Sequence, residues 1–218
     1  MSQAQDFTPG CQQRSHKGRN VAIISTEWHR DIVEMLVRDA EHTLGEAGIR
    51  VEHYVVPGSF ELPQAASFIL QRRKTADITD PRGEVNNPQR TGRPIDGIIC
   101  FGVVVQGDTP HFTFISQAVA NSLEQIACHD GQANRVPVMF GVLTTNTVQQ
   151  ARDRADGTHS RKGVEVAQAL IRMFDFQSLA TGMHWESILE CLQRDDMRKR
   201  EESHAGHGAK PSGNQESA

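Results

Sequence analysis

The chain has 218 residues, of which 37% are hydrophobic and 23% charged, a composition typical of a globular protein with one main domain and short appendages. Its formal net charge of −4 lacks the basic excess of a general nucleic-acid binder. The longest strongly apolar stretch, residues 98–105, is far shorter than the roughly 20 residues that cross a bilayer, and the polar residues 1–18 do not resemble a secretory signal. We therefore expect a cytoplasmic protein with neither nucleic acid nor a membrane as its partner.

The four cysteines are widely separated and show no paired spacing of the kind that predicts a disulfide or a metal site. Cys100 and Cys128 fall in apolar segments, where a reduced thiol in the core is the favoured interpretation. The cysteine pattern therefore predicts a reducing compartment and no bound metal.

The first half of the chain alternates strand and helix patterns behind a polar segment, residues 1–19, which we expect to be a flexible arm. Residues 21–24 are an apolar run typical of a buried strand. Residues 30–47 carry apolar side chains at helical spacing, and Gly48 suits the position just past the helix end. A second strand is predicted at residues 51–56, followed by a helix. The expected core positions of the two helices are Ile32, Val33, Leu36, Val37, Ala40 and Leu44, and then Leu62, Ala65, Ala66, Ile69 and Leu70.

The second half continues this alternation after residues 74–94, a polar stretch without apolar periodicity that predicts an exposed insertion. Strands are predicted at residues 97–105 and 138–143, and the first of them leads through a glycine turn into a helix. Thr147 and Gln150 have the spacing of a capping box at the start of a short helix. The inner positions of the helix before the last strand are Ile115, Ala118, Val119, Leu123 and Ile126. Those of the final helix, residues 162–174, are Val164, Ala167, Leu170, Ile171 and Phe174.

Strands and helices that alternate at this connection length form parallel sheets with right-handed crossovers, covered by helices on both faces. The sequence therefore predicts the α/β class, as a three-layer α/β/α sandwich around a four-stranded, mainly parallel sheet. We expect the main domain over residues 20–176. Residues 177–218 become rich in charge and then in Gly, Ser and His, and we expect this C-terminal extension to be partly disordered.

Ligands bind at the carboxyl ends of strands in open α/β sheets, so the residues after the four predicted strands are expected to converge on one rim. After the third strand, Gly107 leads into a helix start, with Thr109 as a suitable N-cap and Pro110 at the first helical position. Free backbone N–H groups and the positive end of the helix dipole make such a turn an anion site, and His111 beside it suits acid–base chemistry. The alternative is a capping loop with a surface histidine.

Two further strand ends carry candidate ligand groups. After the second strand, Gly58 permits close approach of a ligand, and Glu61 in the first helical turn is placed for hydroxyl or ring N–H groups. The alternative role of Glu61 is to stabilise the helix dipole. Trp28 follows the first strand by a few residues, and it either stacks on a flat heteroaromatic ring or belongs to the core.

The fourth strand end comprises residues 140–145, with Arg154 and Lys162 further along the chain. Arg154 suits a bidentate phosphate contact, and a surface salt bridge is the usual alternative. The sequence has no GxxxxGKS/T run, no GxGxxG run after the first strand and no HExxH motif. P-loop, dinucleotide-binding and zincin functions therefore lack support.

In combination, these segments resemble the lumazine synthase family over about residues 20–175, in family order and spacing apart from the insertion at 74–94. The matching segments are Val56-Pro57-Gly58-Ser59-Phe60-Glu61-Leu62-Pro63, Gly107-Asp108-Thr109-Pro110-His111-Phe112, Pro137-Val138-Met139-Phe140-Gly141-Val142-Leu143-Thr144, Gln150-Ala151 with Arg154-Ala155, and Lys162-Gly163. The resemblance implies a flavodoxin-like sheet.

The resemblance also implies a transferase that condenses 5-amino-6-ribitylaminouracil with 3,4-dihydroxy-2-butanone 4-phosphate, without a metal or an organic cofactor. It gives His111 the catalytic role of proton transfer. The substrate-binding residues that it implies are Trp28, Ser59, Phe60, Glu61, Val104, Val105, Phe140 and Lys162, and the phosphate-binding residues are Asp108, Thr109 and Arg154.

In this family the residues that match Phe140 and Arg154 reach the site from the adjacent subunit, so the resemblance implies a homo-oligomer. We expect a pentamer at least, and we favour twelve pentamers closed into a shell over an isolated pentamer. His29, Gln106 and Thr113 stand where asparagine, arginine and an acidic residue are common in the family, which bears on fine substrate contacts rather than on the class of reaction.

Two other functions compete with the enzyme. A non-catalytic lumazine or flavin binder is the main alternative, although such a carrier has no use for the phosphate-elimination residues His111 and Arg154. A flavodoxin-like electron-transfer module would need a phosphate loop after the first strand, and residues 25–29 lack the glycines expected there.

Overall fold

The computed structural model describes residues 16–76, 94–131 and 136–180. The chain divides into two compact units, and the unit Ser15–Gln177 contains the whole sheet. The other unit combines Met1–Arg14 with Ser178–Ala218 and falls almost entirely outside the described residues. Most of the predicted N-terminal arm, insertion and C-terminal extension also lies outside them.

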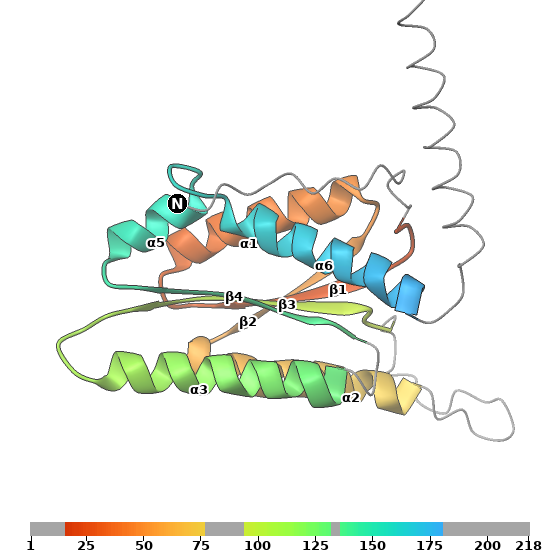
Figure 1. Cartoon of the computed structure of the whole chain (residues 1–218), viewed down its shortest axis with the longest axis horizontal. Coiled ribbons are helices and arrows are strands. Elements are labelled where there is room, and N and C mark those ends of the chain that lie inside the picture. The colour runs from red at the N-terminus through yellow and green to blue at the C-terminus, as the bar shows by residue number, and fades with distance from the viewer. Residues whose placement is uncertain (1–15, 77–93, 132–135, 181–218) are drawn as a thin grey trace, which may run out of the picture. The chain divides into compact units, whose positions relative to one another are not determined.

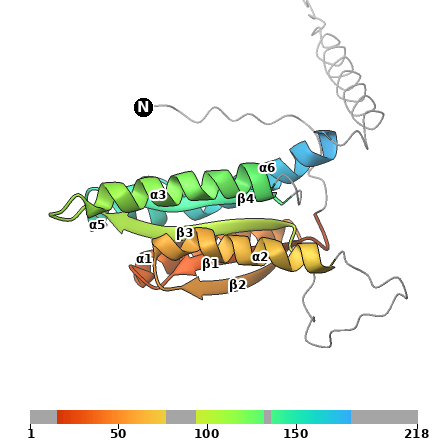
Figure 2. The same ribbon diagram turned by 90° about the horizontal axis from the view of Figure 1, so that it is seen from below.

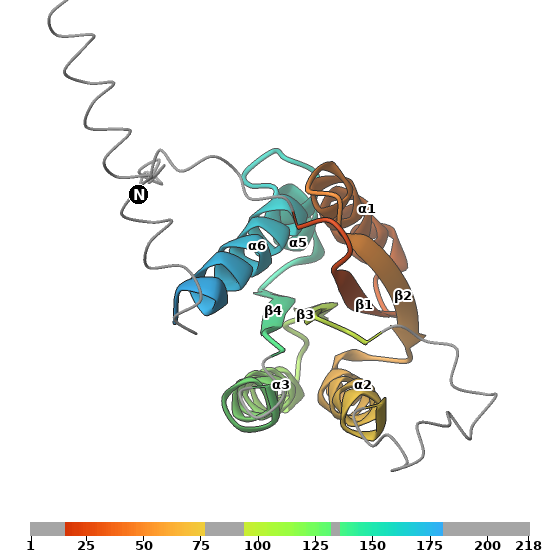
Figure 3. The same ribbon diagram turned by 90° about the vertical axis from the view of Figure 1, so that its right-hand side faces the viewer.

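Four parallel strands form one sheet in the order β2-β1-β3-β4. The strands are β1 (Asn20–Thr26), β2 (Arg50–Val56), β3 (Gly97–Val105) and β4 (Val138–Thr145). Helices α1 (Arg30–Glu46), α5 (Val148–Ala155) and α6 (Lys162–Ala180) cover one face, and α2 (Leu62–Ala76) and α3 (His111–Ile126) cover the other (Figures 1 and 3). The predicted three-layer α/β/α sandwich is confirmed.

The sheet separates two apolar cores, because successive side chains of each strand point to opposite faces. On one face Ile23 and Phe101 pack with α1, α5 and α6, and on the other Ile24 and Cys100 pack with α2 and α3. Every residue of β1 is buried, as expected of an inner strand in a sheet covered on both sides. Helices α2 and α3 lie side by side on their face (Figure 2).

Two predicted helix boundaries are confirmed in detail. At the end of α1, Gly48 has φ +74, its N–H bonds to the Gly45 carbonyl at 2.9 Å, and the Ile49 N–H bonds to the Leu44 carbonyl at 3.0 Å. These two bonds are the Schellman arrangement, in which glycine accepts the left-handed conformation at little cost.

The predicted capping box at the start of α5 is also present. The Gln150 N–H donates to Thr147 Oγ1 at 3.2 Å, and the Gln150 side chain accepts in return from the Asn146 N–H at 3.0 Å. In the usual capping box the return bond goes to the N-cap residue itself, so here it is displaced by one position.

Three other boundaries differ from the predictions. Helix α2 continues to Ala76, so the first three residues of the predicted 74–94 insertion are helical. Helix α6 continues to Ala180, six residues past its predicted end at Phe174. Pro110 rather than Thr109 is the N-cap of α3, and the helix has no side-chain cap there, because the proline ring carries no hydrogen-bond acceptor.

The two described cysteines differ in environment. Cys100 is fully buried in β3 as predicted, and burial raises the pKa of its thiol to about 12. Cys128 is exposed, contrary to the prediction: it lies in the π-helical turn Ala127–Gly131 that follows α3, and its Sγ donates to Glu124 Oε1 at 3.1 Å. No helix within the described ranges is long and apolar enough to cross a membrane.

Candidate active site

The carboxyl ends of the four strands lie at one edge of the sheet, and this edge is stepped. Thr26 pairs with Val56, so β1 and β2 end at the same level. Ser25 pairs with Phe101, so β1 ends about three residues, roughly 10 Å, before β3 ends at Val105. Strands β3 and β4 therefore extend beyond β1 and β2. The step leaves space beside β3 for the chain that leaves β2.

The 3₁₀ turn Ser59–Glu61, which follows β2, occupies this step and contacts both β3 and α3. Ser59 is buried, and a Cβ placed on Gly102 would lie 2.6 Å from Ser59 Oγ and 3.2 Å from Thr26 Cγ2. Gly102 is therefore required for the close approach of Ser59 to β3. The sequence analysis missed this role, although a glycine that interrupts an apolar strand is a usual signal of close approach.

Trp28, Gly58 and Glu61 come together at the same edge. The Trp28 side chain is 70% exposed, which excludes the core alternative for this residue. A Cβ on Gly58 would lie 3.1 Å from Glu61 Oε2 and 3.7 Å from Trp28 Cδ1, so the indole and the carboxylate flank the same glycine. The arrangement offers an aromatic face, a hydrogen-bond acceptor and an accessible backbone within one small region.

The remaining predicted residues of this region are less enclosed. Phe60 is 59% exposed in the 3₁₀ turn, and Val104 and Val105 are half-buried at the protruding end of β3. Their backbone lies next to the end of β4, because Val104 pairs with Thr144 and Val105 with Thr145.

The turn after β3 keeps the features of an anion site. The Gln106 N–H bonds to the Thr145 carbonyl at 2.9 Å, which extends the ladder of β3 and β4 by one residue. The backbone N–H groups of Gly107, Asp108 and Thr109 bond to no other described residue, and the side chains here are exposed. His111 is the first residue of α3, where the helix dipole favours negative charge.

Phe140 does not lie at this edge in the same chain. It pairs with Cys100 near the beginning of β4, about five residues or roughly 17 Å from the strand end at Thr145. The expectation that residues 140–145 form one strand end with the other site residues is therefore wrong for Phe140. Phe140 lies on β4, the outermost strand of the sheet, and its side chain is 43% exposed.

Arg154 and Lys162 lie on the opposite layer from His111. Arg154 is half-buried in the last turn of α5, where its Nη1 donates to the Gln150 carbonyl at 3.0 Å. It forms no ion pair within the described part of the chain, so the salt-bridge alternative gains no support. Lys162 begins α6 and pairs with Glu165 one turn later.

A separate cavity of about 480 Å³ opens between α1 and the ends of β1 and β2. It contains none of the predicted site residues, although it adjoins the chain that leads to Trp28. Its lining consists of Ser25, Thr26, Glu27, Arg30, Val33, Glu34, Val37 and Val55. Across the described ranges, no three His, Cys, Asp or Glu side chains gather as metal ligands would.

Comparison with known proteins places this geometry in a family. The family model for 6,7-dimethyl-8-ribityllumazine synthase matches residues 18–178. A protein of that name from Porphyromonas gingivalis is 36% identical over 160 residues, which cover 72% of this chain and 84% of the relative. The Deinococcus deserti protein is 40% identical over 153 residues, 69% and 83% of the two chains, and the Micrococcus luteus protein is 35% identical over 170 residues, 77% and 90%. The chain therefore belongs to the lumazine synthase family.

Proposed function

We propose that this chain condenses 5-amino-6-ribitylaminouracil with 3,4-dihydroxy-2-butanone 4-phosphate to give 6,7-dimethyl-8-ribityllumazine, inorganic phosphate and water. The observation that carries the proposal is that an aromatic and polar cluster, Trp28, Gly58 and Glu61, shares one edge of the sheet with a turn, Gly107–Thr109, whose backbone N–H groups are unbonded among the described residues. A bisubstrate reaction between a heteroaromatic amine and a phosphorylated ketone requires these two kinds of site side by side.

The uracil binds on the Trp28 side of the edge. The exposed indole stacks on the flat pyrimidine ring, and the Val104 and Val105 backbone at the protruding end of β3 contacts the ring edge. Glu61 accepts hydrogen bonds from the ribityl hydroxyls, and Ser59 and Phe60 hold the same chain partly through backbone groups.

The butanone phosphate binds on the α3 side. The N–H groups of Asp108 and Thr109, the Thr109 hydroxyl and the positive end of α3 hold the phosphate. Arg154 of the adjacent subunit adds a bidentate contact, and Lys162 a further substrate contact. His111 then lies beside the reacting atoms, within the first turn of α3.

The chemistry proceeds through proton transfers that His111 serves. The 5-amino nitrogen attacks the ketone carbon, and loss of water gives an imine. Proton removal from C3 and elimination of the C4 phosphate then leave an enol, which tautomerises to a new ketone at C3. The ribitylamino nitrogen adds to this carbonyl carbon, and loss of a second water completes the lumazine. Holding both reactants in place supplies a large part of the rate, and such positioning is worth several kcal/mol.

The site is completed by a second subunit. Phe140 lies roughly 17 Å from the edge of its own sheet, so it reaches a substrate only from a neighbouring chain. Exposed aromatic side chains on α2 and α3, Phe68 at 59% and Phe114 at 67%, supply apolar surface for contacts between subunits. We propose a cytoplasmic pentamer, and we favour closure of twelve pentamers into a shell because the connection between α5 and α6, residues 156–161, is short.

The test is to incubate the purified full chain with both substrates and to follow lumazine fluorescence and phosphate release together. Formation of both products in equal amounts supports the proposal. A protein that binds lumazine but releases no phosphate would instead be a carrier, and the catalytic proposal would fail. Light scattering tests the assembly: a mass of five chains supports the pentamer, sixty chains support the shell, and one chain would overturn the shared site.

A further inference from the structure

The connection between α5 and α6 folds back onto the end of α5. The His159 N–H donates to the Asp153 carbonyl at 2.8 Å, and the Thr158 N–H donates to Asp156 Oδ1 at 2.8 Å. Gly157, with φ +95, makes the reversal that these two bonds require. The connection therefore has a defined shape of its own, and Arg154 and Lys162 lie at its two ends.

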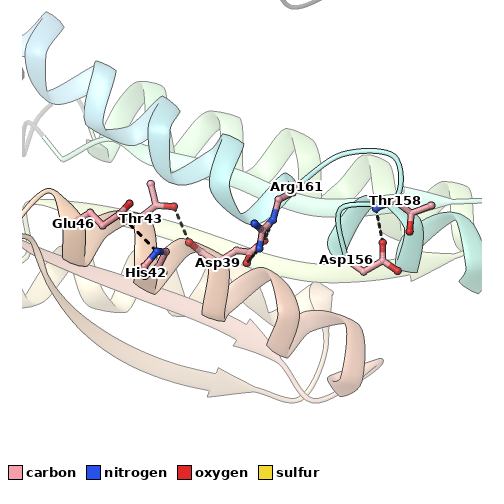
Figure 4. A network of polar contacts seen from close by, with 7 residues as sticks. All are labelled: Asp39, His42, Thr43, Glu46, Asp156, Thr158 and Arg161. Carbon is pink, nitrogen blue, oxygen red and sulfur yellow. Dashed lines mark hydrogen bonds and ion pairs between the residues drawn. The ribbon is translucent and has the colours of Figure 1, made fainter.

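The same connection is fixed to α1 by a bidentate ion pair. Arg161 Nη2 donates to Asp39 Oδ1 at 2.6 Å, and Arg161 Nε donates to Asp39 Oδ2 at 3.1 Å (Figure 4). The Asp39 side chain is 13% exposed, so this pair is shielded from water on its acidic side. A planar guanidinium that uses two donors on one carboxylate sets direction as well as distance.

A backbone contact two residues later adds a second anchor. A Cβ on Gly163 would lie 2.3 Å from the Leu36 carbonyl oxygen and 2.8 Å from Asp39 Cβ. The start of α6 therefore touches the backbone of α1 one turn from Asp39. Lys162 lies between the two anchors, Arg161 and Gly163, so the position of its backbone depends on both.

We propose that Asp39 and Arg161 are a positioning pair for phosphate recognition, a role that rests on the proposed function of Arg154 and Lys162. The pair holds the connection at a set angle to α1 and thereby sets where Arg154 lies relative to the phosphate and where Lys162 lies relative to the substrate. Two of the five guanidinium N–H donors of Arg161, on Nε and Nη2, are bonded to Asp39, so we assign Arg161 to positioning rather than to direct phosphate binding. Asp39 touches no substrate and acts through Arg161.

Calorimetry with inorganic phosphate and, separately, with 6,7-dimethyl-8-ribityllumazine tests the pair in the full-length assembled protein. Arg161→Gln is expected to weaken phosphate binding roughly three- to tenfold and to leave lumazine binding unchanged. Asp39→Asn is expected to have the same effect, and Arg161→Lys, which keeps the charge but loses the fork, an intermediate one. The control is Arg172→Gln, an equal change of charge at an exposed position of α6, which should leave both affinities unchanged.

A kinetic measurement separates positioning from general stability. In Arg161→Gln the KM for the butanone phosphate should rise while kcat and the KM for the uracil stay near their original values. The inference is overturned if phosphate affinity is unchanged, if both ligands weaken equally, or if the unmodified protein binds no phosphate. A protein that binds phosphate and shows the expected Arg161 effects but makes no lumazine would refute the proposed function and keep the positioning role.

Discussion

The segment that binds the phosphate in our proposal, residues 106–110 after β3, and the segment that positions Arg154 and Lys162, residues 156–161 before α6, are built in opposite ways. In the first, the Gln106 N–H is the only backbone N–H group that bonds to another described residue. A Cβ added to Gly107 would have no other atom within 4 Å. In the second, backbone bonds, the Arg161–Asp39 pair and the packed Gly163 fix the chain.

This difference matches the chemistry that each segment supplies. Backbone N–H donors can serve an anion only when the protein has not already used them, so the N–H groups of Gly107, Asp108 and Thr109 must stay unbonded. Binding through a mobile segment costs backbone as well as side-chain entropy, so a rigid base for Arg154 and Lys162 removes the backbone part of that cost. We therefore expect substitutions in the first segment to affect chemistry without affecting stability, and substitutions in the second to affect both.

The largest effect is expected at His111. Replacement by alanine should lower kcat by about 10²–10⁴-fold, the usual loss for a general acid–base group. The free energy of unfolding should change by no more than about 0.5 kcal/mol, because the side chain is exposed. A pH profile of kcat and a urea titration measure the two quantities, and an unchanged kcat at every pH would refute the role of His111.

Arg154→Ala should weaken binding of the butanone phosphate roughly 10- to 100-fold, because a hydrogen-bonded charge pair is lost. Binding of the uracil substrate should stay the same, since that molecule carries no anion. Calorimetry with each substrate alone makes the measurement. Equal losses for both ligands would contradict the assignment of Arg154 to the phosphate.

A pair of glycine substitutions compares the two segments directly. Gly163→Ala should destabilise the protein by about 1–3 kcal/mol, because the new methyl group meets the Leu36 carbonyl oxygen and the helices must separate. Gly107→Ala should change stability by less than about 0.5 kcal/mol, since nothing lies near the added atom. Urea unfolding of both variants provides the test, and equal losses would remove the contrast between the segments.

Local patterns were sufficient to predict the layers of this fold. The apolar run of β3, the helical spacing in α1 and the glycine at its end each depend on a few neighbouring residues, and all appear where predicted. The ends of α2 and α6 were not predictable in this way, because no proline or glycine directly follows the last apolar residue of either predicted helix, Leu70 or Phe174. Cys128 was placed wrongly for a similar reason, since the π-helical turn that exposes it has no local signature.

The candidate site was predictable only in part, because its residues come from distant segments. The groups after β1, β2 and β3 were found from strand ends alone, and the structure brings them to one edge. The pair Arg161–Asp39 joins residues 122 positions apart, which no local pattern reveals. His29, which the sequence singled out because asparagine is common at this position in the family, has φ +54. Asparagine adopts this left-handed conformation at lower cost, so the departure marked an unusual backbone.

The smallest effect concerns the ion pair between Arg152 of α5 and Asp31 of α1. The hydrogen bond from Arg152 holds the pKa of the Asp31 carboxyl below its ordinary value, so the ionised carboxylate favours the folded state. This contribution is present above the ordinary aspartate pKa of about 3.9 and is lost as the pH falls through the lower folded value. Asp31→Asn should therefore reduce stability by less than about 1 kcal/mol at neutral pH, and the difference should shrink both below about pH 4 and in high salt.

Asp156→Asn is the matched control: the pKa of Asp156 is lowered mainly by the Thr158 backbone N–H, and an asparagine oxygen can accept the same bond. A loss for Asp31→Asn that is independent of salt and pH would show that Arg152 holds α5 through packing rather than charge.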